Sequence, residues 1–202
     1  GEPRKALEAL HEDGERRGAF ESHRSRGEAQ EALGCFDQAF EEYQLALRDF
    51  PFDEALMNRI SDLAIRCERQ EEGIKFFARL QKKRQIDRLP SLFNLGILLH
   101  AQGKTHRVAE VTKKIETLIP NDSFGLGYLI RLLQHQGKTR KIKTIAKRYL
   151  TDEVQGEIRA EVLFAVAQVY RDEGANAKAL DATHEGLVAS PFHAGLKALR
   201  DD

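Results

Sequence analysis

The chain has 202 residues, of which 41% are hydrophobic and 32% charged, and its 32 basic and 32 acidic side chains cancel. It contains no apolar run of the ~20 residues that a membrane-spanning helix needs, and it is too hydrophobic for a disordered chain. Its two cysteines, Cys35 and Cys67, are too few for a disulfide framework, so a hydrophobic core must hold the fold.

The zero net charge hides an uneven distribution along the chain. Residues 1–50 carry 7 basic and 12 acidic groups, whereas residues 101–150 carry 11 basic and 3 acidic groups. Residues 151–202 are acidic again, with 5 basic and 10 acidic groups. The chain is therefore acidic at both ends and basic in the middle, and the net charge by itself implies no nucleic-acid or membrane partner.

The first predicted element is a helix near the start of the chain. Its sequence RKALEALHE, Arg4–Glu12, resembles AKALDATHE, Ala177–Glu185, near the other end. We expect Ala177–Glu185 to be the second helix of a repeat. By this likeness, residues 1–19 should be the second helix of a preceding, truncated repeat.

Glycine and proline then recur with a regular spacing. Gly34, Gly103, Gly137 and Gly174 each separate two amphipathic stretches, at intervals of 69, 34 and 37 residues. Three of the five prolines follow one of these glycines by 17 residues: Pro51, Pro120 and Pro191. Glycine readily ends a helix and proline interrupts one, so the spacing predicts helix-turn-helix units of about 34 residues.

The segments between these breaks have the period of amphipathic helices. Apolar residues recur at i, i+3, i+4 and i+7 in residues 36–47, 92–99 and 126–133. Alternating runs of β-branched residues between turn dipeptides, which indicate strands, are missing. The sequence therefore predicts an all-α fold.

In this pattern the chain resembles the tetratricopeptide-repeat (TPR) family, chiefly in Leu33–Asp53, Leu92–Asp122 and Leu163–Pro191. The resemblance implies a right-handed α-solenoid of about five repeats. Their expected limits are 20–53, 54–88, 89–122, 123–159 and 160–191, with residues 192–202 beginning a capping helix or a further repeat. Two units depart from the family pattern. The second has Glu68 in place of the turn glycine, and the fourth lacks the closing proline.

No recognisable catalytic or cofactor-binding motif occurs. The phosphate-binding, serine-hydrolase and zinc-protease signatures are missing, and the seven histidines are scattered singly. Cys35 and Cys67 lie 32 residues apart, without the spacing of zinc ligands, and are interpreted as small, partly buried thiols. We therefore expect this chain to have no enzymatic activity, no cofactor and no metal.

In the TPR family the first helices of the repeats line a concave groove that binds peptides. The resemblance places eight residues of the third to fifth repeats on this groove: Phe93, Asn94, Ile97, Phe124, Tyr128, Arg131, Phe164 and Gln168. Four of them are aromatic, and a contiguous apolar patch on a surface usually marks a binding site. The alternative interpretation is that these aromatic side chains pack between adjacent helices.

A second candidate surface is basic and belongs to the outer helices. It comprises Lys113, Lys114, Lys138, Arg140, Lys141, Lys143, Lys147 and Arg148. The acidic residues that would form i,i+4 pairs are missing between Lys138 and Leu150. Such a cluster attracts an acidic protein, an anionic membrane surface or a nucleic acid, or it is simply a solvated helix face.

These features together predict a non-catalytic scaffold or adaptor that binds a peptide or helix of a partner protein in its concave groove. One alternative is the binding of nucleic acid or another polyanion through the convex basic helix. Another is the substrate-recruiting region of a larger enzyme. The acidic ends also allow self-association by head-to-tail contact, and the sequence does not indicate a compartment.

Overall fold

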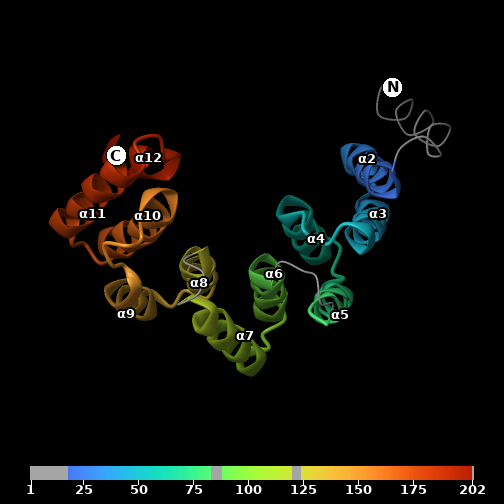
Figure 1. Ribbon diagram of the computed structural model, residues 1–202, viewed down its shortest axis with the longest axis horizontal. Helices are drawn as coiled ribbons and strands as arrows, with labels where there is room; N and C mark the ends of the chain where they lie inside the picture. Colours follow the sequence, from blue (N-terminus) through green and yellow to red (C-terminus); the bar gives the residue numbers. More distant parts are fainter. Residues whose placement is uncertain (1–17, 83–87, 120–123, 202) are drawn as a thin grey trace. The chain divides into compact units, whose positions relative to one another are not determined.

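The computed structural model describes residues 18–82, 88–119 and 124–201. All regular structure in these ranges is helical, with eleven helices and no strand (Figure 1). The predicted all-α fold is thus confirmed. The helix predicted in residues 1–19 lies almost entirely outside the described residues.

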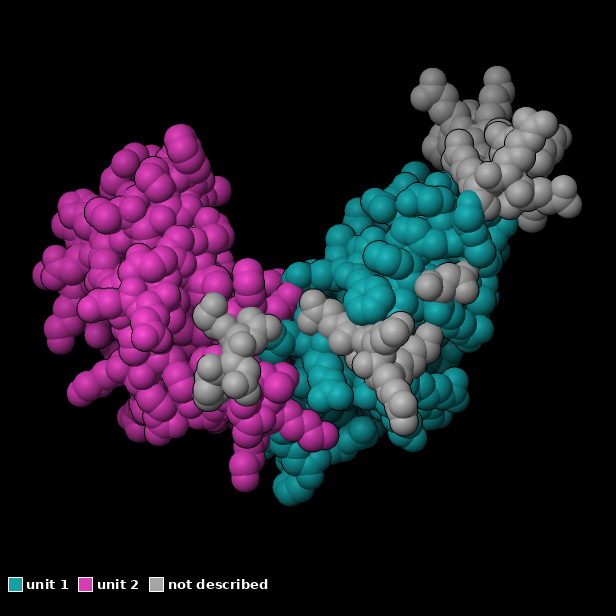
Figure 2. Space-filling model, viewed as in Figure 1, with its two compact units in different colours: residues 1–111 teal, residues 112–202 magenta. Residues whose placement is uncertain are grey.

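The chain divides into two compact units, residues 1–111 and 112–202, and the boundary lies inside α7 (Figure 2). The helices of unit 1 are α2 (Ala19–Ala32), α3 (Phe36–Asp49), α4 (Glu54–Arg66), α5 (Gln70–Leu80), α6 (Arg88–Ala101) and the first part of α7 (Thr105–Leu118). Those of unit 2 are the rest of α7, α8 (Phe124–His135), α9 (Thr139–Tyr149), α10 (Gly156–Asp172), α11 (Asn176–Ala189) and α12 (Ala194–Asp201). We call the even-numbered helices first helices and the odd-numbered ones second helices.

One turn geometry follows five of the first helices. After α2, the amide of Cys35 donates to the carbonyl of Gln30 over 2.8 Å, and that of Gly34 donates to Glu31 over 2.9 Å. These two bonds form a Schellman motif, which needs a left-handed residue at the turn. The predicted turn glycines all have positive φ, at 77° for Gly34, 68° for Gly103, 63° for Gly137 and 73° for Gly174.

The second unit makes the same turn without a glycine. Glu68 has a φ of 57°, the only positive value of a non-glycine residue in the described ranges. The amide of Arg69 donates to the carbonyl of Ala64 over 2.7 Å, and that of Glu68 to Ile65 over 3.2 Å. The fold therefore imposes the turn on a residue that adopts it at a conformational cost.

Close contacts between first and second helices build the core of unit 1. A Cβ atom added to Gly27 on α2 would lie 2.3 Å from a ring carbon of Tyr43 on α3. Tyr43 is almost fully buried, and its hydroxyl donates to the carboxylate of Glu31 over 2.9 Å. Arg59 of α4 donates to the other oxygen of Glu31, also over 2.9 Å. Packing and hydrogen bonds thus join three consecutive helices.

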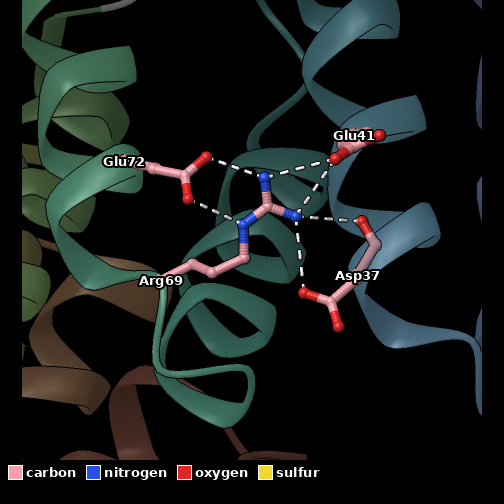
Figure 3. A network of polar contacts seen from close by, with 4 residues as sticks. All are labelled: Asp37, Glu41, Arg69 and Glu72. Carbon is pink, nitrogen blue, oxygen red and sulfur yellow. Dashed lines mark hydrogen bonds and ion pairs between the residues drawn. The ribbon is translucent and has the colours of Figure 1, made fainter.

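Ion pairs join consecutive second helices of unit 1 on their outer side. Arg69, which precedes α5, contacts Glu72 at 2.7 Å, Glu41 at 3.3 Å and Asp37 at 3.4 Å (Figure 3). Its guanidinium also lies 4.7 Å from the centre of the Phe40 ring. The hydrogen bond with Glu72, with further bonds and charge from Glu41, raises the pKa of Arg69, so the cation is firmly charged.

In unit 2, α10 contacts α8, α9, α11 and α12. Here too a glycine allows a close approach, since a Cβ atom at Gly186 of α11 would lie 2.5 Å from Leu196 of α12. Leu196 is fully buried. Because α12 packs on both α10 and α11, it repeats the packing of α6 on α4 and α5 and of α10 on α8 and α9.

Candidate functional site

The clearest candidate surface in unit 2 is a stripe along α8. Phe124, Gly127, Tyr128 and Arg131 are spaced i, i+3, i+4 and i+7, so they share one face of the helix. Phe124 is 64% exposed, a high value for a large apolar side chain, while Tyr128 and Arg131 are half-buried. The Arg131 guanidinium lies 5.8 Å from the centre of the Tyr128 ring, within cation–π range.

Gly127 leaves open space in the middle of this stripe. A Cβ atom added there would meet no heavy atom within 4 Å, whereas one at Gly125 on the same helix would lie 3.3 Å from Ile119. Within unit 2, Gly127 is therefore not required for packing between helices. It exposes helix backbone between Phe124 on one side and Tyr128 and Arg131 on the other, and a ligand side chain can approach closely there.

The two predicted groove residues of α10 contribute to contacts between helices. The Phe164 ring lies 5.3 Å from the His193 ring, and Gly195 of α12 provides the space that Phe164 occupies. Gln168 accepts a hydrogen bond from Gln134 of α8 over 2.9 Å. Both side chains are half-buried, so part of each is exposed to solvent.

The groove prediction is wrong for two residues of α6. Phe93 is 4% exposed and Asn94 is 1% exposed, so neither side chain is available on the surface. Asn94 donates to Asn58 of α4 and to the carbonyl of Pro90, each over 2.9 Å. The physical reason is that α6 is apolar nearly all round, and such a helix is buried. The third predicted residue of α6, Ile97, is half-buried.

All eight residues of the predicted basic surface lie in unit 2. Two of them are paired: Lys143 contacts Glu173 at 2.7 Å, and Arg148 contacts Glu116 at 3.0 Å. The other six form no ion pair within the described residues: Lys113, Lys114, Lys138, Arg140, Lys141 and Lys147.

Unit 1 also has an exposed aromatic cluster that the sequence pattern did not predict. Phe20, at the start of α2, lies 5.3 Å from Phe50, which lies 5.5 Å from Phe52. Phe50 is 47% exposed and Phe52 is 45% exposed. Phe192 of unit 2 is 85% exposed. The available signal was a phenylalanine directly after a helix-breaking proline, as in Pro51-Phe52 and Pro191-Phe192.

Other features add no catalytic chemistry to these surfaces. Cys35 is exposed rather than partly buried, and Cys67 is half-buried, with a thiol pKa that burial raises. In the described ranges no three His, Cys, Asp or Glu side chains gather as metal ligands. None of the described helices is long and apolar enough to cross a membrane. An open depression of about 440 Å³ in unit 2 lies between α10, α11 and α12, away from the α8 stripe.

Comparisons with known proteins identify the fold through solved structures. No family model matches the chain, and no curated protein matches it in sequence. Among solved structures, a tetratricopeptide repeat protein from Parabacteroides merdae aligns with a TM-score of 0.61 and 13% identity, covering 100% of this chain and 77% of that one. TTC0263, a TPR protein of Thermus thermophilus, gives 0.56 at 19% identity over 90% of this chain and 97% of its own. The type IV pilus biogenesis factor PilW gives 0.54 at 18% identity, covering 98% and 90%. The chain therefore has the tetratricopeptide-repeat fold.

Proposed function

We propose that this chain is a non-catalytic protein-binding module that captures a segment of a partner protein on the α8 stripe, that is, Phe124, Gly127, Tyr128 and Arg131. The observation that carries the proposal is the 64% exposure of Phe124 next to the open space over Gly127. The fold favours this class of function by analogy, since TPR-like repeats offer surfaces rather than catalytic centres.

The chemistry of the stripe specifies the ligand in outline. Covering the exposed part of Phe124 with an apolar side chain removes apolar area from water, which contributes at most ~2 kcal/mol. The space over Gly127 admits a bulky apolar side chain close to the backbone. Arg131 carries a positive charge one turn beyond, so an acidic group four or so residues from the apolar anchor complements it. We therefore expect a peptide with a large apolar residue and a nearby carboxylate.

The test begins with a random-peptide display library selected on the full chain. We expect enriched peptides to bind the chain, and Phe124→Ala to weaken them by about tenfold or more, as truncation of an aromatic anchor commonly does. Phe124 is largely exposed, so the melting temperature of this variant should change little. Peptides that bind Phe124→Ala as tightly as the original chain would contradict the proposed site.

Gly127 provides a sharper test, because stability and binding should move in opposite directions. Replacing a helix glycine with alanine stabilises by ~0.5–1 kcal/mol where the methyl group has room, as it has at Gly127. We expect Gly127→Ala to raise the melting temperature and weaken peptide binding, and Gly127→Leu to weaken binding further by filling the open space. Thr144→Leu, at an exposed position of α9, adds a similar side chain away from the stripe and is the control. Equal binding by all three variants would refute the site.

A further inference from the structure

The outer ion pairs of unit 1 follow a rule that unit 2 breaks. In unit 1 the carboxylates stand in the first turns of a second helix, and the cation stands at the start of the next one. Arg69 meets Asp37 and Glu41 in this way (Figure 3), and Lys104 meets Glu71 at 2.6 Å. Asp37 and Glu71 each lie three residues after the left-handed turn residue, Gly34 or Glu68.

In α9 the corresponding position is basic. Arg140 lies three residues after the left-handed Gly137, where α3 has Asp37 and α5 has Glu71. The residue at the start of the next second helix is Ala175 rather than an arginine or lysine. The charge at this repeat position is therefore reversed in α9. The next second helix has no acidic residue at the position equivalent to Arg69, where Ala175 stands.

The consequence is an exposed basic face on α9. Its exposed side chains are Arg140, Lys141, Thr144, Lys147 and Arg148, while Ile142, Ile145 and Ala146 are buried against the core. Of the four exposed cations only Arg148 has a carboxylate partner, Glu116, within the described part of the chain. The apolar side of α9 is packed in the core, whereas Arg140, Lys141 and Lys147 form no ion pair with any residue that the structure describes.

These cations form two short rows. Arg140 and Lys147 are seven residues apart, as are Lys141 and Arg148, so each pair lies on one line with a rise of about 10 Å along the helix. A neighbouring helix with acidic residues at the same interval would meet both members of a row. Two contacts within the protein show that cations of α9 pair with carboxylates of neighbouring helices, since Arg148 binds Glu116 of α7 and Lys143 binds Glu173 at the end of α10.

The composition of this face favours an acidic polypeptide over the other anionic partners. The only aromatic residue of α9, Tyr149, is half-buried and lies 5.8 Å from the Arg148 guanidinium, so α9 has no fully exposed ring on which a base could stack. No aliphatic side chain is exposed that could enter a bilayer, because the apolar face of α9 is in the core. We propose that the exposed basic face of α9 docks an acidic helical segment of a protein partner. This proposal is independent of the α8 stripe.

The test uses the full chain and a fluorescein-labelled helical peptide of about 20 residues, long enough to be helical by itself. The peptide carries glutamate at i, i+4 and i+7 along one face, and a companion peptide has glutamine at these positions. Binding is measured by fluorescence anisotropy at low ionic strength and at about 0.3 M salt, where exposed charges are largely screened. We expect the glutamate peptide to bind at low salt and to lose affinity at high salt, and the glutamine peptide not to bind.

Charge reversal at the two cations of one row, Arg140 and Lys147, tests whether this face is the binding site. Arg140→Glu/Lys147→Glu should weaken the glutamate peptide by about tenfold or more, since like charges then face each other. Lys75→Glu/Arg79→Glu on α5 makes the same change in net charge at two other exposed positions and should bind like the original chain. Arg140→Gln/Lys147→Gln provides a milder second variant. Both residues are exposed, so circular dichroism and melting temperature should be unchanged.

Three results would overturn the proposal. The first is equal binding of the glutamate and glutamine peptides. The second is an equal loss in the α5 control, which would mean that only net charge matters. The third comes from duplex DNA, single-stranded DNA or phosphatidylserine vesicles in the same assay. Tighter binding by any of these that depends on Arg140 and Lys147 would assign the face to a nucleic acid or a membrane instead.

Discussion

Replacing Glu68 with glycine should stabilise this protein, although most substitutions destabilise a fold. Glu68 occupies the turn between α4 and α5 with a φ of 57°, a left-handed conformation that glycine adopts freely. The four equivalent turns have glycine with φ between 63° and 77°, so the substitution needs no change of backbone. The Glu68 side chain is exposed and forms no ion pair within the described residues, so little is lost with it.

The expected gain follows from two opposing terms. A non-glycine residue in the left-handed region costs ~1–2 kcal/mol, which the substitution relieves. Glycine also makes the unfolded chain more flexible, which offsets ~0.4–1 kcal/mol of that gain. We therefore expect Glu68→Gly to increase the free energy of unfolding by about 0.5–1 kcal/mol.

Urea denaturation followed by circular dichroism measures this gain as a shift of the transition midpoint to higher urea. Gly103→Ala is the reciprocal change, at a φ of 68°. A Cβ atom at Gly103 would meet nothing within 4 Å, so any loss there reports backbone strain rather than a clash. We expect Gly103→Ala to lose ~1 kcal/mol. A lower midpoint for Glu68→Gly, or no change for Gly103→Ala, would refute the strain argument.

Two further predictions concern the core. Leu129 of α8 is fully buried, so Leu129→Ala should cost ~2–5 kcal/mol in the same urea assay, and a loss below ~1 kcal/mol would contradict its core position. Burial, together with the hydrogen bond to Glu31, raises the pKa of Tyr43 above its ordinary value. The folded state therefore holds this proton more tightly than the unfolded state, whose pKa is ~10, and the resulting stability is present below pH ~10 and lost as the pH rises further. Tyrosinate absorbance should show Tyr43 ionising only with unfolding, whereas ionisation before unfolding would contradict this.

The turns could be predicted from the sequence because they depend on local chemistry. A left-handed residue is required where a first helix ends, and glycine meets that requirement cheaply. The spacing of Gly34, Gly103, Gly137 and Gly174 therefore indicated the phase of the helices. At Glu68 the phase was evident from the neighbouring units, and the structure shows that tertiary packing imposes the turn even there.

The exposure of individual side chains could not be predicted in the same way. Phe93 and Phe124 both lie on first helices, yet Phe93 is 4% exposed and Phe124 is 64% exposed. Helical periodicity identifies the face on which a residue lies, but not which neighbouring helix covers that face. Asn94 makes the same point, because the family resemblance placed it on the groove, whereas it is 1% exposed. Its hydrogen-bond partner Asn58 lies 36 residues earlier in the sequence, which a local pattern does not reveal.

In a repeat protein, however, such distant partners recur at a nearly constant interval. The ion pairs between second helices join residues 28 to 33 positions apart, as in Glu41 with Arg69 and Glu71 with Lys104. Applied to the basic segment, this interval points to the two acidic residues at the end of α10, Asp172 and Glu173. Arg140, Lys141 and Lys143 all lie 30 to 33 residues before Glu173, and Lys143 contacts both oxygens of that carboxylate. Asp172 lies at the same interval, yet within the described residues no ion pair joins it to α9. The excess positive charge of α9 therefore follows from which carboxylates the fold brings close and from the local absence of acidic residues, and the interval alone does not predict it.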